Sequence, residues 1–130
     1  MKINEENYVD KAESVIKKLN VEVDKKGKQV GVVTTSKIRN LLAMSADIYN
    51  DVLNNKSEAL DSELIGRINY LKIRFVYEAG RDQKVKKLVE GAEIVEIINE
   101  IGNKKKNFIL FNRYMEALVA YRKFIVGGED

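Results

Sequence analysis

The chain has 130 residues, of which 45% are hydrophobic and 33% charged, and its formal net charge is +3. Cysteine and histidine are absent, which excludes disulfides and thiolate metal sites and removes the commonest general base. The polar, acidic N-terminus is unlike a signal peptide and no apolar run approaches the roughly 20 residues of a membrane span, so we expect one cytoplasmic domain over 1-130, without membrane attachment.

The first predicted helix runs from about Glu5 to Leu19, where apolar residues recur at helical spacing. Residues 20-34 follow and are rich in lysine, with Gly27 and Gly31 among them. Their alternating pattern leaves a small β-hairpin open, but two strands alone are only marginally stable. We therefore expect a basic flexible loop.

Four further helices are predicted from apolar periodicity and end signals. Their expected bounds are Thr34–Ser36 to Asn54–Asn55, Ser57 to Gly80, Asp82 to Gly102, and 108–121 after a basic connector at 104–106. The absence of proline favours uninterrupted helices. About five helices joined by short loops predict an all-α fold, a small helical bundle.

Carboxylates offer the only pattern resembling an enzyme site. Glu93, Glu96 and Glu100 share one helix face, and three carboxylates can hold a divalent cation. No second ligand cluster and no phosphate-binding glycine motif accompany them. A solvated acidic face, or a surface for a basic partner, is the favoured interpretation. We predict no catalytic residue, no metal site and no cofactor.

Cations lie at the predicted starts of two helices. Lys37 and Arg39 begin the second helix, and Lys84, Lys86 and Lys87 begin the fourth. A helix start is positive, so each cation there is unfavourable by a few tenths to about 1 kcal/mol, whereas a bound phosphate reverses the sign. Ordinary salt-screened surface lysines are the alternative for either cluster alone. The repetition of the feature favours a polyanion ligand.

Three arginines of the third helix recur every seven residues and so lie near one stripe: Arg67, Arg74 and Arg81. Ordinary surface pairs are possible for all of them, namely Glu63–Arg67, Arg74–Glu78 and Glu78–Arg81. Arg81 follows Gly80 at the helix end, where its side chain can project freely, and it is the arginine we single out.

Aromatic side chains are expected mainly in the core, because most keep helical spacing with aliphatic neighbours. Stacking on nucleic-acid bases is the less favoured alternative. These residues are Tyr70, Tyr77, Phe108, Phe111, Tyr114, Tyr121 and Phe124.

Three segments, taken together and in this order, resemble the small subunit of the type III-A CRISPR–Cas effector, the Csm complex. They are Thr34 to Leu42, Tyr70 to Arg81 and Tyr114 to Lys123. The resemblance spans about residues 33–124. It implies a helical protein without enzymatic activity that acts in antiviral defence.

The resemblance also implies partners and site residues. Several copies would stack along the groove where guide CRISPR RNA pairs with target RNA, beside the backbone subunits that cleave target RNA and the large polymerase-like subunit. Carried over by position, the RNA-binding residues would be Lys37, Arg39, Lys72, Arg74, Arg81 and Lys123. Arg67 and Arg122 lie outside the shared pattern. A helical protein–protein adaptor without nucleic-acid contact remains the alternative.

Overall fold

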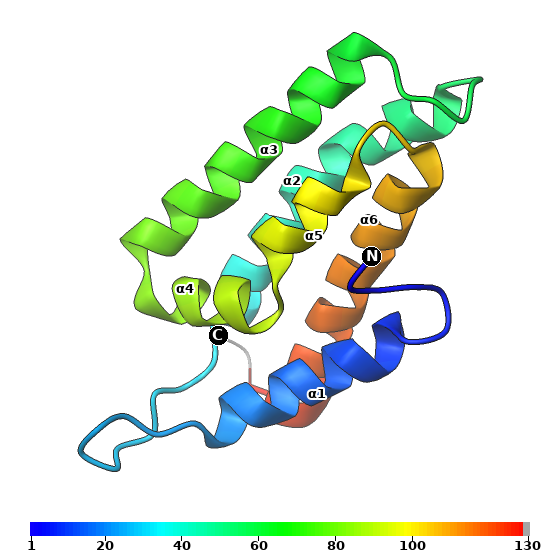
Figure 1. Cartoon of the computed structure of the whole chain (residues 1–130). Coiled ribbons are helices and arrows are strands. Elements are labelled where there is room, and N and C mark those ends of the chain that lie inside the picture. The colour runs from blue at the N-terminus through cyan, green and yellow to red at the C-terminus, as the bar shows by residue number, and fades with distance from the viewer. Residues whose placement is uncertain (129–130) are drawn as a thin grey trace.

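The computed structural model describes residues 1–128 (Figure 1). Its helices are α1 (Tyr8–Val21), α2 (Thr35–Asn54), α3 (Ser62–Arg81), α4 (Gln83–Gly91), α5 (Ile94–Ile101) and α6 (Lys105–Tyr121), and a π-helical turn, η1 (Arg122–Val126), follows α6. No strand forms within the described residues. The predicted all-α bundle is confirmed, with six α-helices where about five were expected.

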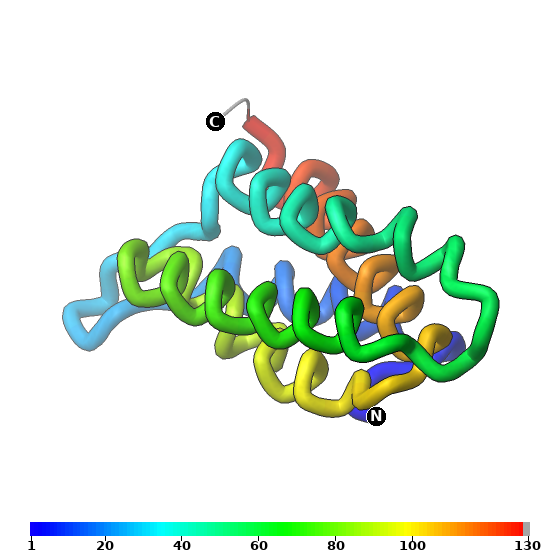
Figure 2. Tube along the Cα trace, turned by 90° about the horizontal axis from the view of Figure 1, so that it is seen from above, coloured from blue at the N-terminus to red at the C-terminus, as the bar shows by residue number. Residues whose placement is uncertain are grey.

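Helix α6 lies at the centre of the bundle and packs against α1, α2 and α5, while α3 packs against α2, α4 and α5. Figure 2 shows the long helices α2 and α3 side by side and running in opposite directions. Phe75, Phe108 and Phe111 are fully buried, and the rings of Phe75 and Phe111 meet edge to face with centroids 6.2 Å apart. This aromatic contact joins α3 to α6 in the core.

The third helix begins at Ser62, so the predicted start at Ser57 was wrong. Asp61 caps it by accepting a hydrogen bond from the Leu64 N–H at 2.9 Å. The residues before Asp61 lie outside the helix because they pair with the segment that leads into α6, where Leu60 N–H donates to Asn103 O at 2.7 Å. A contact between distant segments therefore overrides the local helix signal.

The predicted fourth helix is two helices, because the chain turns at Glu93, which adopts φ 57° and ψ 39°. This left-handed conformation is unfavourable for a residue with a Cβ atom. Three tertiary contacts hold it. Lys2 and Lys11 pair with the Glu93 carboxylate at 2.9 and 2.6 Å, and the Tyr114 hydroxyl donates to the Ala92 carbonyl at 3.0 Å.

The starts of α1 and α6 lie closer to their predicted positions. Helix α1 begins at Tyr8, after a turn in which Asn4 N–H donates to the Asn7 side chain at 2.7 Å. Helix α6 begins at Lys105, inside the predicted connector, and the Lys105 ammonium donates to Asn55 O at 2.7 Å just past the end of α2. A cation there suits the negative end of the helix dipole.

Helix α1 extends to Val21, so the predicted start of the loop at residue 20 was wrong. The residues from 22 to 34 form a turn with one isolated antiparallel bridge between Val23 and Gln29. Asp24 N–H donates to Lys28 O at 2.8 Å, and Val30 N–H donates to Glu22 O at 3.1 Å. The segment therefore forms a single bridge and not the two-stranded hairpin that its alternating sequence allowed. Its flexibility stays a prediction. None of the helices in residues 1–128 has the length and hydropathy to traverse a lipid bilayer.

Candidate nucleic-acid interface

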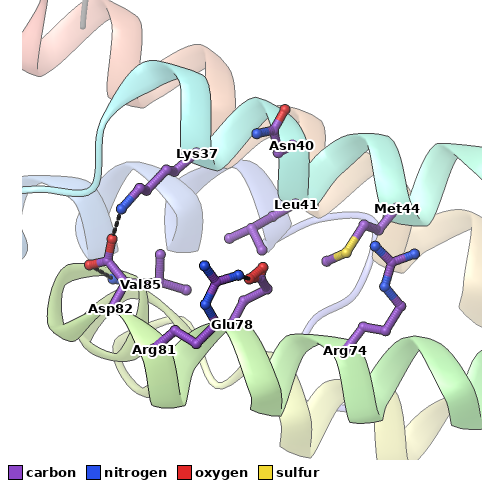
Figure 3. A pocket seen from close by; sticks show the side chains of 9 residues that line it. All are labelled: Lys37, Asn40, Leu41, Met44, Arg74, Glu78, Arg81, Asp82 and Val85. Atoms are coloured by element: carbon purple, nitrogen blue, oxygen red, sulfur yellow. Dashed lines mark hydrogen bonds and ion pairs between the residues drawn. The ribbon is translucent and has the colours of Figure 1, made fainter.

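A groove runs between α2, the C-terminal half of α3 and the start of α4 (Figure 3). Because α2 and α3 are antiparallel, the beginning of α2 lies beside the end of α3. The cavity measures about 420 Å³, and the buried side chains of Leu41 and Val85 supply an apolar floor. Its lining residues are Lys37, Asn40, Leu41, Met44, Arg74, Glu78, Arg81, Asp82 and Val85.

Lys37 is the third residue of α2 and pairs with the carboxylate of Asp82 across the groove. Asp82 also caps α4, accepting hydrogen bonds from the N–H groups of Lys84 at 2.9 Å and Val85 at 3.3 Å. The hydrogen bond from Lys37 is the largest of the effects that hold the pKa of Asp82 below its usual value, and the backbone bonds add to it.

The Lys37–Asp82 pair weakens the prediction of a bound polyanion that was based on cations in the first helical turn. Lys37 does not require an incoming anion to make its position favourable, because Asp82 already supplies one. Asp82 therefore offsets the dipole of α4 through its cap and the charge of Lys37 through the ion pair, while Thr34 caps α2. What the structure adds in favour of a polyanion is the convergence of cations from different helices on one groove.

Arg81 and Arg74 enter the groove from α3. The Arg81 guanidinium pairs with Glu78 at 3.1 Å, which confirms the predicted pair, and lies 5.5 Å from the centroid of the Tyr77 ring. The predicted Arg74–Glu78 pair does not form among the described residues, where Arg74 has no ion pair or hydrogen bond. Arg74 is thus the exposed cation of the groove that no carboxylate neutralises.

The remaining predicted site residues lie outside the groove. Arg39 is exposed, but it falls just past the first turn of α2, so the predicted dipole penalty does not apply fully to it. Lys72 is half-buried on α3. Lys123 lies in η1, where its ammonium donates to Gly128 O at 2.7 Å. The structure therefore gathers Lys37, Arg74 and Arg81 and separates the other three from them.

Of the three lysines at the start of α4, Lys87 is the one with an ion-pair partner among the described residues. Lys87 pairs with Glu22 at 3.1 Å. Lys84 and Lys86 are exposed and form no ion pair within residues 1–128. The Lys87–Glu22 pair fastens the start of the segment after α1 to α4. Arg67 likewise pairs with Asp51 of α2 at 2.5 Å, so the predicted partner Glu63 was wrong.

The acidic stripe of α5 has a structural role. Glu93 binds Lys2 and Lys11 as described above, and Glu100 accepts a hydrogen bond from the Lys2 N–H at 2.8 Å. These contacts fasten the N-terminal segment to the bundle. In residues 1–128, no group of three or more His, Cys, Asp or Glu side chains is arranged to hold a metal ion.

Two features escaped the sequence analysis. Arg122 is only 2% exposed and donates to the carbonyls of Val33 at 2.7 Å and Gly127 at 2.5 Å, so it ties the segment before α2 to the end of the chain. The core prediction holds for Phe108, Phe111 and Tyr114. It was wrong for Tyr70, Tyr77 and Phe124, which are exposed. Tyr70 and Tyr77 lie off the buried stripe of α3, a signal that was readable from the spacing.

Comparison with known proteins points to one family. Residues 13–128 match the model of the family described as Csm2 Type III-A. The chain is 46% identical over 128 residues to the CRISPR system Cms protein Csm2 of Streptococcus thermophilus, with 98% of each chain covered. Proteins of the same name from Mycobacterium tuberculosis and Enterococcus italicus are 34% identical over 96% of this chain and 36% identical over 82% of it, and the alignments cover 96% and 80% of those proteins.

Proposed function

Since this chain belongs to the Csm2 family of type III-A CRISPR systems, we propose that it is a non-catalytic, RNA-binding structural subunit of the type III-A effector complex. Several copies stack along the groove where guide CRISPR RNA pairs with target RNA. Other copies of the chain, the backbone subunits and the large subunit are its protein partners. The complex acts in the cytoplasm, in antiviral defence.

The observation that carries the RNA proposal is the meeting of Lys37, Arg74 and Arg81 in one groove. The three residues come from two helices and span more than forty positions of the chain, yet their charged ends line the same cavity. Each is exposed, so each can reach a phosphate without unfolding the bundle. Arg39, Lys72 and Lys123 remain in the proposal as contacts outside the groove.

The recognition is independent of sequence. Guide and target sequences vary in such a system, so the subunit holds phosphates and the shape of the RNA rather than base edges. Exposed lysine and arginine side chains suit that task because their charges attract any phosphate. Each copy binds weakly, and several copies in a row add avidity.

A salt titration of the full chain with a mixed-sequence RNA oligonucleotide tests the proposal. Each phosphate contact steepens the log–log dependence of affinity on salt by about 0.7 for single-stranded RNA. We expect the double variant Lys37→Ala with Arg81→Ala to bind more weakly and to lose about two such contacts. Lys17→Ala with Lys18→Ala is the matched control, because both are exposed lysines of α1 outside the groove and the net charge falls by the same two units. Affinity and slope equal to those of the control would exclude the groove as the RNA site.

The alternative function, a protein–protein adaptor without nucleic-acid contact, has one observation in its favour. Tyr70, Ile73, Val76 and Tyr77 form an exposed apolar face on α3, and such patches are typical of protein interfaces. On the acidic face of α5, Glu93 is paired internally, which leaves the exposed carboxylates Glu96 and Glu100 as the part of that face open to a basic partner. Pull-downs of the native complex with and without ribonuclease separate the two: partners that are retained undiminished after RNA digestion favour the adaptor.

A further inference from the structure

The groove holds carboxylates as well as cations. Glu78 and Asp82 line it together with Lys37, Arg74 and Arg81, so its net charge is +1 rather than +3. Resting on the function proposed above, we propose that Glu78 and Asp82 are specificity-determining residues. They compete with RNA for the groove's cations, so an isolated phosphate gains little there and a continuous phosphate backbone is required.

The two carboxylates lie beneath the cations that they hold. In the Lys37–Asp82 pair the side chains are 53% and 20% exposed. In the Arg81–Glu78 pair they are 63% and 32% exposed. An approaching polyanion therefore meets the cations first and the carboxylates behind them. It can share a cation with its carboxylate, but it cannot expel a carboxylate that belongs to the same chain.

The two oxygens of Asp82 have separate tasks. Oδ1 accepts the hydrogen bonds from the N–H groups of Lys84 and Val85 that cap α4. Oδ2 faces the Lys37 ammonium. The cap requires one acceptor oxygen, which an asparagine supplies equally well, whereas the hold on Lys37 depends on the negative charge. Charge and cap can therefore be separated by one substitution.

Arg74 makes the competition selective. It has no ion pair among residues 1–128, so it can receive a first phosphate at full strength. Lys37 and Arg81 contribute only when further phosphates of the same strand lie close enough to compete with Asp82 and Glu78. A single phosphate cannot contact all three cations at once, whereas an RNA strand presents several phosphates at regular spacing and can do so.

The test uses the full chain with Asp82→Asn and Glu78→Gln, singly and together, titrated with a mixed-sequence RNA oligonucleotide and with inorganic phosphate. Exposed ion pairs contribute about 0.2–1 kcal/mol, so each substitution should raise RNA affinity by about 1.4- to 5-fold. The double variant should also gain a steeper salt dependence, by about 0.7 per additional phosphate contact. Wild type should bind inorganic phosphate far more weakly than RNA, and the double variant should narrow that difference.

Glu13→Gln is the matched control, because Glu13 pairs with Lys17 on α1 at 3.0 Å, outside the groove, and its loss changes the net charge equally. If the groove variants bind RNA no better than this control, the inference is wrong. If Asp82→Asn lowers the thermal stability, the RNA affinity of Glu78→Gln alone tests the inference. Loss of RNA binding in Lys37→Ala with Arg81→Ala, without any gain in the carboxamide variants, refutes this inference alone. The absence of RNA binding in every variant refutes the proposed function as well.

Discussion

Replacing Tyr114 with phenylalanine tests what holds the break between α4 and α5. Tyr114 is fully buried, and its hydroxyl donates to the Ala92 carbonyl at 3.0 Å. Burial, with a smaller effect from Glu93, raises the pKa of Tyr114 well above its usual range. The hydroxyl is therefore protonated, and a hydrogen-bond donor, at pH 7. The Tyr114→Phe variant removes this donor and keeps the shape of the ring.

The expected magnitude follows from the loss of one buried hydrogen bond. The bond itself contributes about 0.5–1.5 kcal/mol, and a buried carbonyl left without its donor costs about 1–3 kcal/mol. We expect the free energy of unfolding to fall by about 2 kcal/mol. At roughly 2.1 cal/mol/K of unfolding entropy per residue, the whole chain unfolds with about 0.27 kcal/mol/K, so Tm should fall by about 7 °C.

Urea unfolding and thermal unfolding at pH 7, both followed by circular dichroism, measure the two quantities. Tyr70→Phe is the control, because Tyr70 is 62% exposed and a surface change of this kind stays within about 0.5 kcal/mol. If Tyr114→Phe unfolds at the same urea concentration and temperature as Tyr70→Phe, the hydroxyl does not stabilise the break and the reasoning fails.

Two further predictions concern stability. Arg122→Met removes the donors to Val33 O and Gly127 O. Because hydrogen bonds from charged groups contribute about 1.5–3 kcal/mol each, we expect the free energy of unfolding, measured in urea, to fall by about 3 kcal/mol. A fall of less than about 1 kcal/mol would contradict the role of Arg122. The pKa of Glu93 is lowered from 4.5, first by the hydrogen bond from Lys11 and then by that from Lys2, so its stabilising effect is complete above pH 4.5 and is lost as the pH falls through the lowered pKa. Glu93→Gln should therefore be less stable than wild type at pH 7 and should converge on it as the pH falls through the lowered pKa of Glu93. A difference that stays constant from pH 7 into the acid range would exclude the ion pairs as the cause.

Local patterns sufficed for most helices. Helix α2 begins within the predicted range Thr34–Ser36, where Thr34 caps it, because a cap depends on atoms three residues apart. Asp82, the predicted start of the fourth helix, caps α4. The three segments that carry the family resemblance are also local in sequence. The family could therefore be predicted from the sequence alone.

Contacts between distant residues decided the rest. Glu93 has no local reason to adopt a left-handed conformation, and it does so because Lys2, Lys11 and the Ala92–Tyr114 contact hold it. The sequence identified candidate cations, but it could not show which side chains lie beside them in space. Only the antiparallel packing of α2 and α3 brought Lys37, Arg74 and Arg81 into one groove and put carboxylates beneath two of them. The amino-acid sequence by itself determined the helices and the family, because those depend on short-range periodicity and on shared segments. Tertiary structure decided which charges face one another, because electrostatic partners are set by distance in space.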